Sequence, residues 1–233
     1  MNDVFGEAIL DYHLGECNED IITSTSISDE EPLKVSYLFR TFDEMPFLEQ
    51  TALNMANGKV LDIGCGAGSH SLFLKAKGYE VKSIDISPKA IECCRLRGLE
   101  NIEVLNVLNE TDTFDTLLLL MNGSGIFKSL KQTPEVLAHL KTLLNKNGQI
   151  LIDSSDIKYM YEDEDGGFWI DTHNAYYGEL EYTIRYKNNE DSFLWMYLDF
   201  ERLKTACAIV GLNCKKLKKG PHHDFLAQIT LRD

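Results

Sequence analysis

Short hydrophobic runs recur through the middle of the chain, and each stops at a glycine or a polar turn. Residues 60–63 and 117–120 are almost entirely apolar, which is typical of parallel strands covered on both faces. Runs of this kind, bounded by turn residues, predict buried strands rather than helices. The strands are expected at residues 59–63, 79–84, 101–107, 115–121 and 149–153.

Helical patterns lie between these runs. Ser87 precedes Pro88, which places a capping hydroxyl before a proline at the first helical position, and Gly98 marks the end of that helix. The segment 108–114 is short for a helix, so we expect a turn there. The helices between the strands are expected at residues 69–77, 87–98 and 133–145. Strands that alternate with helices in this way predict an α/β fold with a doubly wound sheet and right-handed crossovers.

The carboxyl-terminal part of the chain adds one more helix and two strands. Asp199 is placed to cap a helix that ends at Gly211. Strands are expected at 214–218 and 225–231, on either side of a turn at Gly220. The complete sheet is therefore predicted to have seven strands and to be mostly parallel.

The amino-terminal part of the chain is less regular. Residues 1–28 show little periodicity and are interpreted as an arm that could fold over the site. Ser28 and Glu31 have the spacing of a capping box, which predicts a helix that continues to Arg40. A second helix is expected at 43–56. We therefore divide the chain into an N-terminal arm and helix, 1–42, and a main domain, 43–233.

An insert at residues 154–198 interrupts the alternation of strands and helices. Leu180, Tyr182, Ile184 and Tyr186 alternate with polar residues, and a second strand-like run follows a polar turn, so a β-hairpin before the last helix is predicted. Because both ends of the insert are expected beside the site, we interpret it as a cover over a small ligand. The alternative is that its aromatic side chains pack on the core or on a second subunit. Those side chains are Trp169, Tyr176, Tyr177, Tyr182, Tyr186, Trp195 and Tyr197.

A glycine-rich loop follows the first buried strand. Asp62, Gly64, Gly66 and Gly68 form the pattern D-x-G-x-G-x-G, and a helix begins directly afterwards. Glycines allow a tight turn and a close approach of the backbone to a ligand, which predicts a nucleotide-like cofactor. Asp85 lies 21 residues after Gly64, close to the spacing at which an acidic side chain meets a ribose.

In these two motifs the chain resembles the class I, Rossmann-like S-adenosylmethionine-dependent methyltransferases. The resemblance covers roughly residues 43–153 and 199–231. It implies S-adenosylmethionine as the cofactor, a loop that passes under the methionine part, Asp85 on the ribose and Ile86 on the adenine face. Many relatives have an aspartate where this chain has Asn106. The implied cofactor-binding residues are Asp62, Gly64, Cys65, Gly66, Gly68, Asp85, Ile86, Asn106, Val107, Met121, Asn122 and Arg40.

The role of Arg40 has two interpretations. Arg40 and Tyr37 are one helical turn apart in the expected helix and could cover the methionine carboxylate. The alternative is that the helix packs on the protein with Arg40 at the surface, which would equally account for these two residues.

Because methyl transfer depends mainly on positioning and desolvation, no general base is required. The catalytic candidates are Asn122, Asp153 and Tyr177, with Asp156, His173, Tyr176 and Glu179 as further side chains near the acceptor.

Composition narrows the function classes. The formal net charge of −14 is unfavourable for binding a nucleic-acid backbone. No apolar run reaches the length of a membrane span and no secretory leader is visible, so a cytoplasmic protein with no membrane partner is expected. The 6 cysteines have no zinc spacing, and adjacent histidines at 222–223 lack a third ligand, so no metal is predicted.

The sequence therefore predicts a methyltransferase that acts on a small molecule as a monomer or homodimer. Two alternatives stay open. A non-catalytic module that binds a cofactor or a partner could retain this fold, because fold does not determine function. A nicotinamide-dependent oxidoreductase would need a glycine at the position of Ser69.

Overall fold

A seven-stranded sheet forms the centre of the computed structural model, which describes residues 2–17, 19–163, 165, 167 and 176–232. The strand order is β10-β11-β7-β6-β3-β4-β5, in which β11 is antiparallel to both of its neighbours while β7, β6, β3, β4 and β5 pair parallel with one another. The α/β prediction and the seven-stranded, mostly parallel sheet are confirmed. The strands are β3 (Lys59–Ile63), β4 (Glu80–Asp85), β5 (Ile102–Val104), β6 (Phe114–Leu119), β7 (Leu144–Ser155), β10 (Leu212–Lys219) and β11 (Asp224–Leu231).

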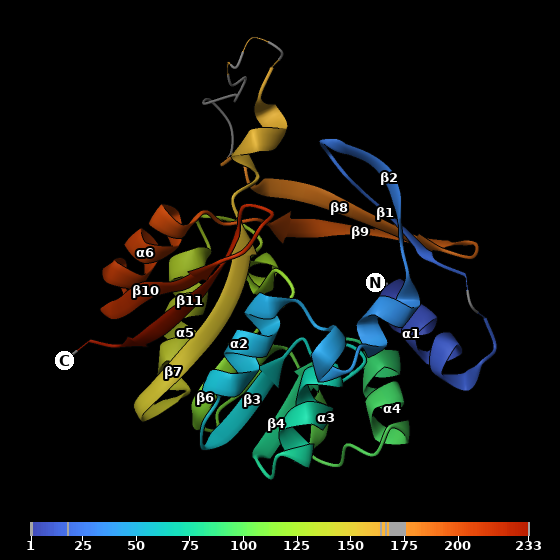
Figure 1. Ribbon diagram of the computed structural model, residues 1–233, viewed down its shortest axis with the longest axis horizontal. Helices are drawn as coiled ribbons and strands as arrows, with labels where there is room; N and C mark the ends of the chain where they lie inside the picture. Colours follow the sequence, from blue (N-terminus) through green and yellow to red (C-terminus); the bar gives the residue numbers. More distant parts are fainter. Residues whose placement is uncertain (1, 18, 164, 166, 168–175, 233) are drawn as a thin grey trace.

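Helices cover both faces of this sheet (Figure 1). Leu117 on β6 packs with α5 and α6, whereas its neighbour Leu118 packs with α2 and α3, as the alternation of side chains along a strand requires. The two apolar layers explain why residues 117–120 have no polar side chain. The helices are α2 (Phe47–Met55), α3 (Ser69–Ala76), α4 (Pro88–Leu96), α5 (Thr133–Thr142) and α6 (Phe200–Ile209). Short 3-10 helices are η1 (Val35–Phe39), η2 (Phe42–Glu44), η3 (Val107–Asn109), η4 (Gly123–Phe127) and η5 (Ile157–Tyr161).

A second, four-stranded sheet joins the N-terminal arm to the insert. The strands β1 (Ile21–Thr25), β2 (Ser28–Leu33), β8 (Glu179–Tyr186) and β9 (Asn189–Met196) have the order β2-β1-β8-β9 and are all antiparallel. Figure 1 shows this sheet lying across the end of the molecule at which the parallel strands β3, β4, β6 and β7 terminate. The predicted hairpin is present, but its pairing with residues 21–25 was not foreseen.

In the first 40 residues the structure contains one helix that the sequence analysis missed, and one predicted helix is wrong. Residues 4–14 form a helix, α1 (Val4–Leu14), that Asp3 caps and that packs on α4, where Asp3 Oδ2 also accepts from Lys89 N at 2.9 Å. Residues 28–40 are not one continuous helix: they form strand β2 and then the short 3-10 helix η1. The capping-box spacing is a local signal, and antiparallel pairing of 28–33 with β1 overrides it.

Candidate functional site

The glycine-rich loop lies at the carboxyl end of β3, on the edge where ligands bind in open α/β sheets. Gly64 N and Cys65 N both donate to Ile84 O, at 2.9 and 3.1 Å, which fastens the loop to β4. Gly64 and Gly66 have φ of +72° and +52°, and a Cβ added to either would have nothing within 4 Å. These two glycines therefore face open space, as the residues of a ligand cradle must.

Gly68 has a different environment. A Cβ at this position would lie 2.8 Å from Leu99 Cδ1 and 2.9 Å from Cys94 Sγ. Its φ is +81° and it is the residue that precedes α3. Gly68 therefore allows α3 and α4 to pack closely behind the loop. Cys65 is also buried, with its Sγ 3.9 Å from that of Cys94.

Asp62 supports the loop from below. It is buried, and its Oδ2 accepts from Ser71 Oγ at 2.5 Å, while Ser71 Oγ lies 2.7 Å from Ser83 Oγ. Burial raises the pKa of the Asp62 carboxyl. This network links β3, α3 and β4, so Asp62 positions the loop rather than facing the open space above it.

Asp85, at the end of β4, is built into the same loop. Its Oδ2 accepts from Gly66 N and its Oδ1 from Ser87 N, both at 2.9 Å. Burial raises its pKa, and the two backbone donors oppose that shift. The next residue, Ile86, is 59% exposed, although it is a large apolar side chain. An aliphatic surface beside an anchored carboxylate matches the adenine and ribose positions that the resemblance implies.

After β5, the structure separates the two predicted residues. Asn106 is exposed, and its Oδ1 accepts from Leu108 N at 3.0 Å. Val107 is buried, and its backbone oxygen accepts from His139 Nε2 at 2.8 Å. Leu108 is an exposed apolar residue beside them that the sequence reasoning missed.

The loop after β6 is held in an uncommon conformation. Met121 and Asn122 have φ of 64° and 60°, which is the left-handed region that favours glycine. Asp153 Oδ1 accepts from Gly123 N at 3.0 Å, and Asn122 Nδ2 donates to Met196 O at 3.2 Å. Two adjacent residues in this region are costly and are typical of functional loops that surrounding contacts hold in place.

The β8–β9 hairpin contacts this loop directly. A Cβ on Gly125 would collide with the indole of Trp195, so the ring packs directly against the backbone of η4. Ser124 Oγ donates to Met196 O at 2.9 Å and lies 2.7 Å from Ser154 Oγ. The side chain of Asn122, a catalytic candidate, therefore takes part in attaching the insert to the sheet.

A buried charged network lies beneath η1, on the side of the loop occupied by α2. Arg40 Nη2 lies 2.7 Å from both carboxylate oxygens of Glu49, and His70 Nε2 lies 2.7 Å from Glu49 Oε2. The Arg40 guanidinium also stacks on the Tyr37 ring, 3.5 Å from its centroid. Of the two interpretations of Arg40, the one with its charge at the surface is wrong, because the side chain is buried.

The network sets the charges of its members. Burial alone raises the pKa of Glu49, but the hydrogen bond from His70 and the charges of His70 and Arg40 bring it below its usual value. Burial alone lowers the pKa of His70, but the hydrogen bond to Glu49 and the charge of Asp62 raise it overall. The sequence reasoning missed Glu49 and His70, although a histidine in the first turn after a glycine loop is a usable signal.

A cavity of about 240 Å³ lies between this network and the end of β7. Asp153 is on its wall, and burial raises the pKa of this carboxyl to about 6. The lining residues come from η1, α2, β7, β11 and their adjoining loops. They are Tyr37, Pro46, Leu48, Glu49, Met121, Asp153, Ser155 and Asp224.

Tyr177, the third catalytic candidate, is outside this lining. Its hydroxyl donates to Asp156 Oδ1 at 2.8 Å, while the hydroxyl of Tyr176 donates to Asp199 Oδ2 at 2.6 Å. Burial raises the pKa of both phenols. Glu179, a further candidate, accepts at Oε1 from Leu130 N at 2.7 Å. His173 and Trp169, which the sequence also singled out, lie outside the described residues.

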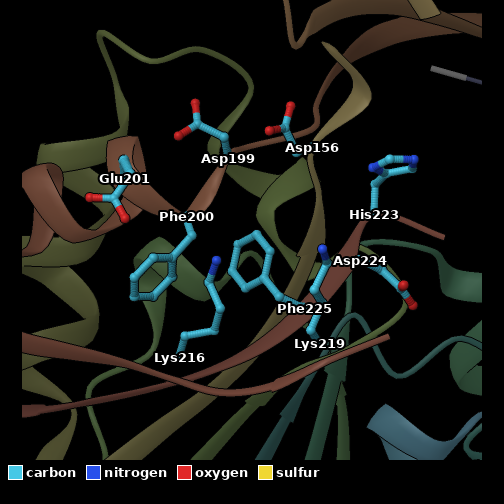
Figure 2. A pocket seen from close by; sticks show the side chains of 9 residues that line it. All are labelled: Asp156, Asp199, Phe200, Glu201, Lys216, Lys219, His223, Asp224 and Phe225. Carbon is cyan, nitrogen blue, oxygen red and sulfur yellow. The ribbon is translucent and has the colours of Figure 1, made fainter. Parts of the chain in front are cut away.

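A second cavity, of about 180 Å³, is lined mainly by residues of α6, β10 and β11. Figure 2 shows Lys216 rising between the rings of Phe200 and Phe225, with its Nζ 4.4 Å and 5.4 Å from their centroids. Asp224 borders both cavities, and in Figure 2 its carboxylate points away from Lys216 and the two rings. The carboxylate of Asp224 is therefore directed away from the centre of this second cavity.

Within the described part of the chain, no group of three or more His, Cys, Asp or Glu side chains is arranged to hold a metal ion. No helix among the residues that the structure describes has the length and apolar character needed to cross a membrane.

Comparisons with known proteins agree with this geometry. A family model described as a methyltransferase domain matches residues 54–194. The crystal structure of an S-adenosylmethionine-dependent methyltransferase from Bacteroides fragilis, in complex with S-adenosyl-L-homocysteine, is 41% identical to this chain. It aligns over 99% of this chain and 95% of that one, with a TM-score of 0.93.

Other relatives are more distant. A ubiquinone biosynthesis O-methyltransferase from Bordetella parapertussis is 36% identical over 55 residues, which is 24% of this chain and 23% of the relative. The chain thus matches less than a quarter of the length of this relative. A sugar N-methyltransferase from Streptoalloteichus has a TM-score of 0.55 over 80% of this chain and 86% of that one, at 14% identity, which shows a shared fold alone.

Proposed function

The chain belongs to the class I family of S-adenosylmethionine-dependent methyltransferases, and from this premise we propose that it methylates a small molecule bound beside Asp153. S-adenosylmethionine is its cofactor and methyl transfer is its reaction. The acceptor, its position and the role of each site residue are the parts that we propose here. The support for these parts is the cavity of about 240 Å³ that Asp153 lines at the end of β7.

The residues at the sheet edge fit the cofactor. The open space over Gly64 and Gly66 accommodates its methionine part, since any side chain there would occupy the same volume. Asp85 keeps lone pairs for the ribose hydroxyls while its two backbone contacts hold it in place. Ile86, after β4, and Asn106 and Leu108, after the adjacent strand β5, would border the adenine.

Methyl transfer from this cofactor is an in-line displacement, in which the acceptor forms a bond to the methyl carbon as the carbon–sulfur bond breaks and its electron pair stays on sulfur. The protein's part is to hold the acceptor on that line and exclude water. Well-oriented reactants gain effective molarities of about 10⁵ to 10⁸ M, which is a large share of an enzymatic rate enhancement. Met121, in the loop after β6, and Asp153, on the adjacent strand β7, are placed to border the acceptor.

We also propose that the four-stranded sheet covers the acceptor side. Its β9 strand is attached to η4 through Asn122, Ser124 and the Trp195–Gly125 contact, so the insert and the loop after β6 form one unit. Trp195→Phe keeps an aromatic ring on Gly125 and serves as the control for Trp195→Ala. We expect the alanine variant to raise the KM for the acceptor while the affinity for S-adenosyl-L-homocysteine stays within threefold.

One observation carries the proposal: large apolar side chains stay exposed where the parallel strands end. Ile86 is 59% exposed, and Met121 is 37% exposed, on either side of the open glycine loop. Isothermal titration with S-adenosyl-L-homocysteine and with NADH tests the cofactor side, and we expect binding of the first alone. Transfer of a labelled methyl group into a metabolite extract tests the enzyme against the non-catalytic alternative, which would bind the cofactor without turnover.

A further inference from the structure

The cavity beside Asp153 has an unequal distribution of charge. Three of its lining side chains, Glu49, Asp153 and Asp224, are carboxylates, and among the described residues no lysine, arginine or histidine lines it. The rest of the lining is mainly apolar, with Leu48 and Met121 among its members. A ligand in this cavity would therefore meet negative charge at one side and apolar surface at the other.

The negative charge of Glu49 is already paired. Arg40 contacts both of its carboxylate oxygens at 2.7 Å, and His70 contacts one of them at 2.7 Å. The carboxylate of Glu49 is therefore already neutralised by Arg40 and His70. The charge that a ligand would meet comes from Asp153 and Asp224.

No cationic side chain is hydrogen-bonded to either of these two carboxylates in the described structure. Asp153 Oδ1 accepts from the backbone amide of Gly123 at 3.0 Å, and Asp224 Oδ1 accepts from that of His222 at 2.9 Å. Both side chains are partly buried. A carboxylate that is partly removed from water and has no cationic partner is less stable as an anion, and a bound cation would form a charge-assisted hydrogen bond with it. An alcohol would supply only a neutral donor, and an acidic ligand would be repelled.

We infer that the acceptor is an amine, which binds as its ammonium form with the nitrogen against the Asp153 carboxylate. The inference rests on the proposed function and names the substrate class of the same site. Leu48 and Met121 then contact the carbon skeleton next to the nitrogen, and Asp224 adds negative potential at the border of the cavity.

The chemistry of an amine balances with the residues present. The ammonium transfers one proton to Asp153, and the nitrogen lone pair that this frees forms the bond to the methyl carbon while the carbon–sulfur bond breaks toward sulfur. The product leaves as a methylammonium ion, and Asp153 returns its proton to water. The raised pKa of Asp153, about 6, brings this carboxylate closer to the pKa of an amine than an ordinary aspartate.

The first experiment measures binding without turnover. Protein saturated with S-adenosyl-L-homocysteine is melted at pH 8 with matched pairs that differ in one group: benzylamine and benzyl alcohol, cyclohexylamine and cyclohexanol. We expect at least one amine to bind tenfold or more tightly than its alcohol. Asp153→Asn should remove that preference, whereas Glu92→Gln, which makes the same charge change at an exposed position on α4, should preserve it.

The same variants separate this inference from its closest competitor. The cofactor also has an ammonium group, and if Asp153 held that group, Asp153→Asn would weaken S-adenosyl-L-homocysteine by tenfold or more. We expect a change below threefold. A large loss overturns the amine assignment and leaves the proposed function intact. Absence of S-adenosyl-L-homocysteine binding to the unmodified protein would instead contradict the proposed function.

The second experiment determines the accepting atom. Protein is incubated with ¹³C-methyl-labelled cofactor and a small-molecule extract of bacterial cells, and the carbon chemical shift of each new methyl group identifies the atom that carries it. We expect the label on nitrogen. Label on oxygen, carbon or sulfur overturns the inference, and so does an absence of label combined with no preference for amines in the melting experiment.

Discussion

The two halves of the site are built in different ways. The cofactor half is local: the loop of residues 64–68 is fastened to β4 by hydrogen bonds to Ile84 O and Asp85, about 20 residues away. The acceptor half is assembled from η1, α2, β7 and β11, which span most of the chain, and is attached to the insert through η4. A local motif can be kept while distant segments vary, so the reaction is easier to identify than the acceptor.

The largest expected effect comes from the network between the two halves. Glu49→Gln leaves Arg40 and His70 buried with a neutral partner, and removal of one member of a buried pair costs about 3 to 5 kcal/mol. We expect a lower free energy of unfolding in urea. Glu30→Gln removes an exposed pair with Arg185 and is the control, with little expected change. Equal effects of the two variants would show that burial of the network has no energetic importance.

Gly66→Val tests the cofactor half alone. A branched side chain would occupy the open space over the loop, and valine at a φ of +52° adds strain, so affinity for S-adenosyl-L-homocysteine should fall by about 100-fold, or 2.7 kcal/mol. Gly78→Val is the matched control, because Gly78 also has a positive φ, +87°, with nothing within 4 Å, and follows α3 away from the loop. If both variants lose affinity equally, strain rather than space explains the loss.

The sequence predicted the cofactor half of the site better than the acceptor half. The segment 59–85 was predictable because its apolar runs, glycines and Asp85 are local signals. The segment 28–40 was predicted as a helix because Ser28 and Glu31 have a capping spacing, whereas residues 28–33 pair with β1. β1 in turn pairs with β8, about 160 positions away, so the sheet that holds this segment is assembled from distant parts of the chain. Glu49 lies 9 residues from Arg40 and 21 from His70, and their contact was missed because these three residues do not form a recognised motif with a defined spacing.

Asp85→Ala is expected to have a smaller effect on affinity than Gly66→Val. The change removes an acceptor for the ribose hydroxyls and also the acceptor of Gly66 N and Ser87 N. Charge-assisted bonds of this kind are worth about 1.5 to 3 kcal/mol, partly recovered by water. Calorimetry should show about a tenfold weaker complex with S-adenosyl-L-homocysteine. An unchanged affinity would remove Asp85 from the ribose site.

The last prediction concerns Asp153 in the acceptor half, where a substitution is expected to raise the stability of the protein rather than lower it. Burial raises the pKa of Asp153 to about 6, from the ordinary value of 3.8, so the folded state holds its proton more tightly than the unfolded state. The stability from this proton is complete below the ordinary pKa and is lost as the pH rises through about 6. The groups that act on Asp153 are Glu49 on α2, His70 on α3, and the backbone amides of Asn122 and Gly123.

Asp153→Asn removes this cost, because the amide stays neutral at every pH. Allowing for partial exposure of the side chain, the variant should be more stable than the unmodified protein by about 1 to 2 kcal/mol at pH 8. The advantage should shrink at pH 5 and approach zero near pH 4. Urea unfolding at these three pH values measures it. A difference that does not depend on pH would mean that burial does not raise the pKa of Asp153. It would also mean that the ionised Asp153 carboxylate does not lower the stability of the empty site.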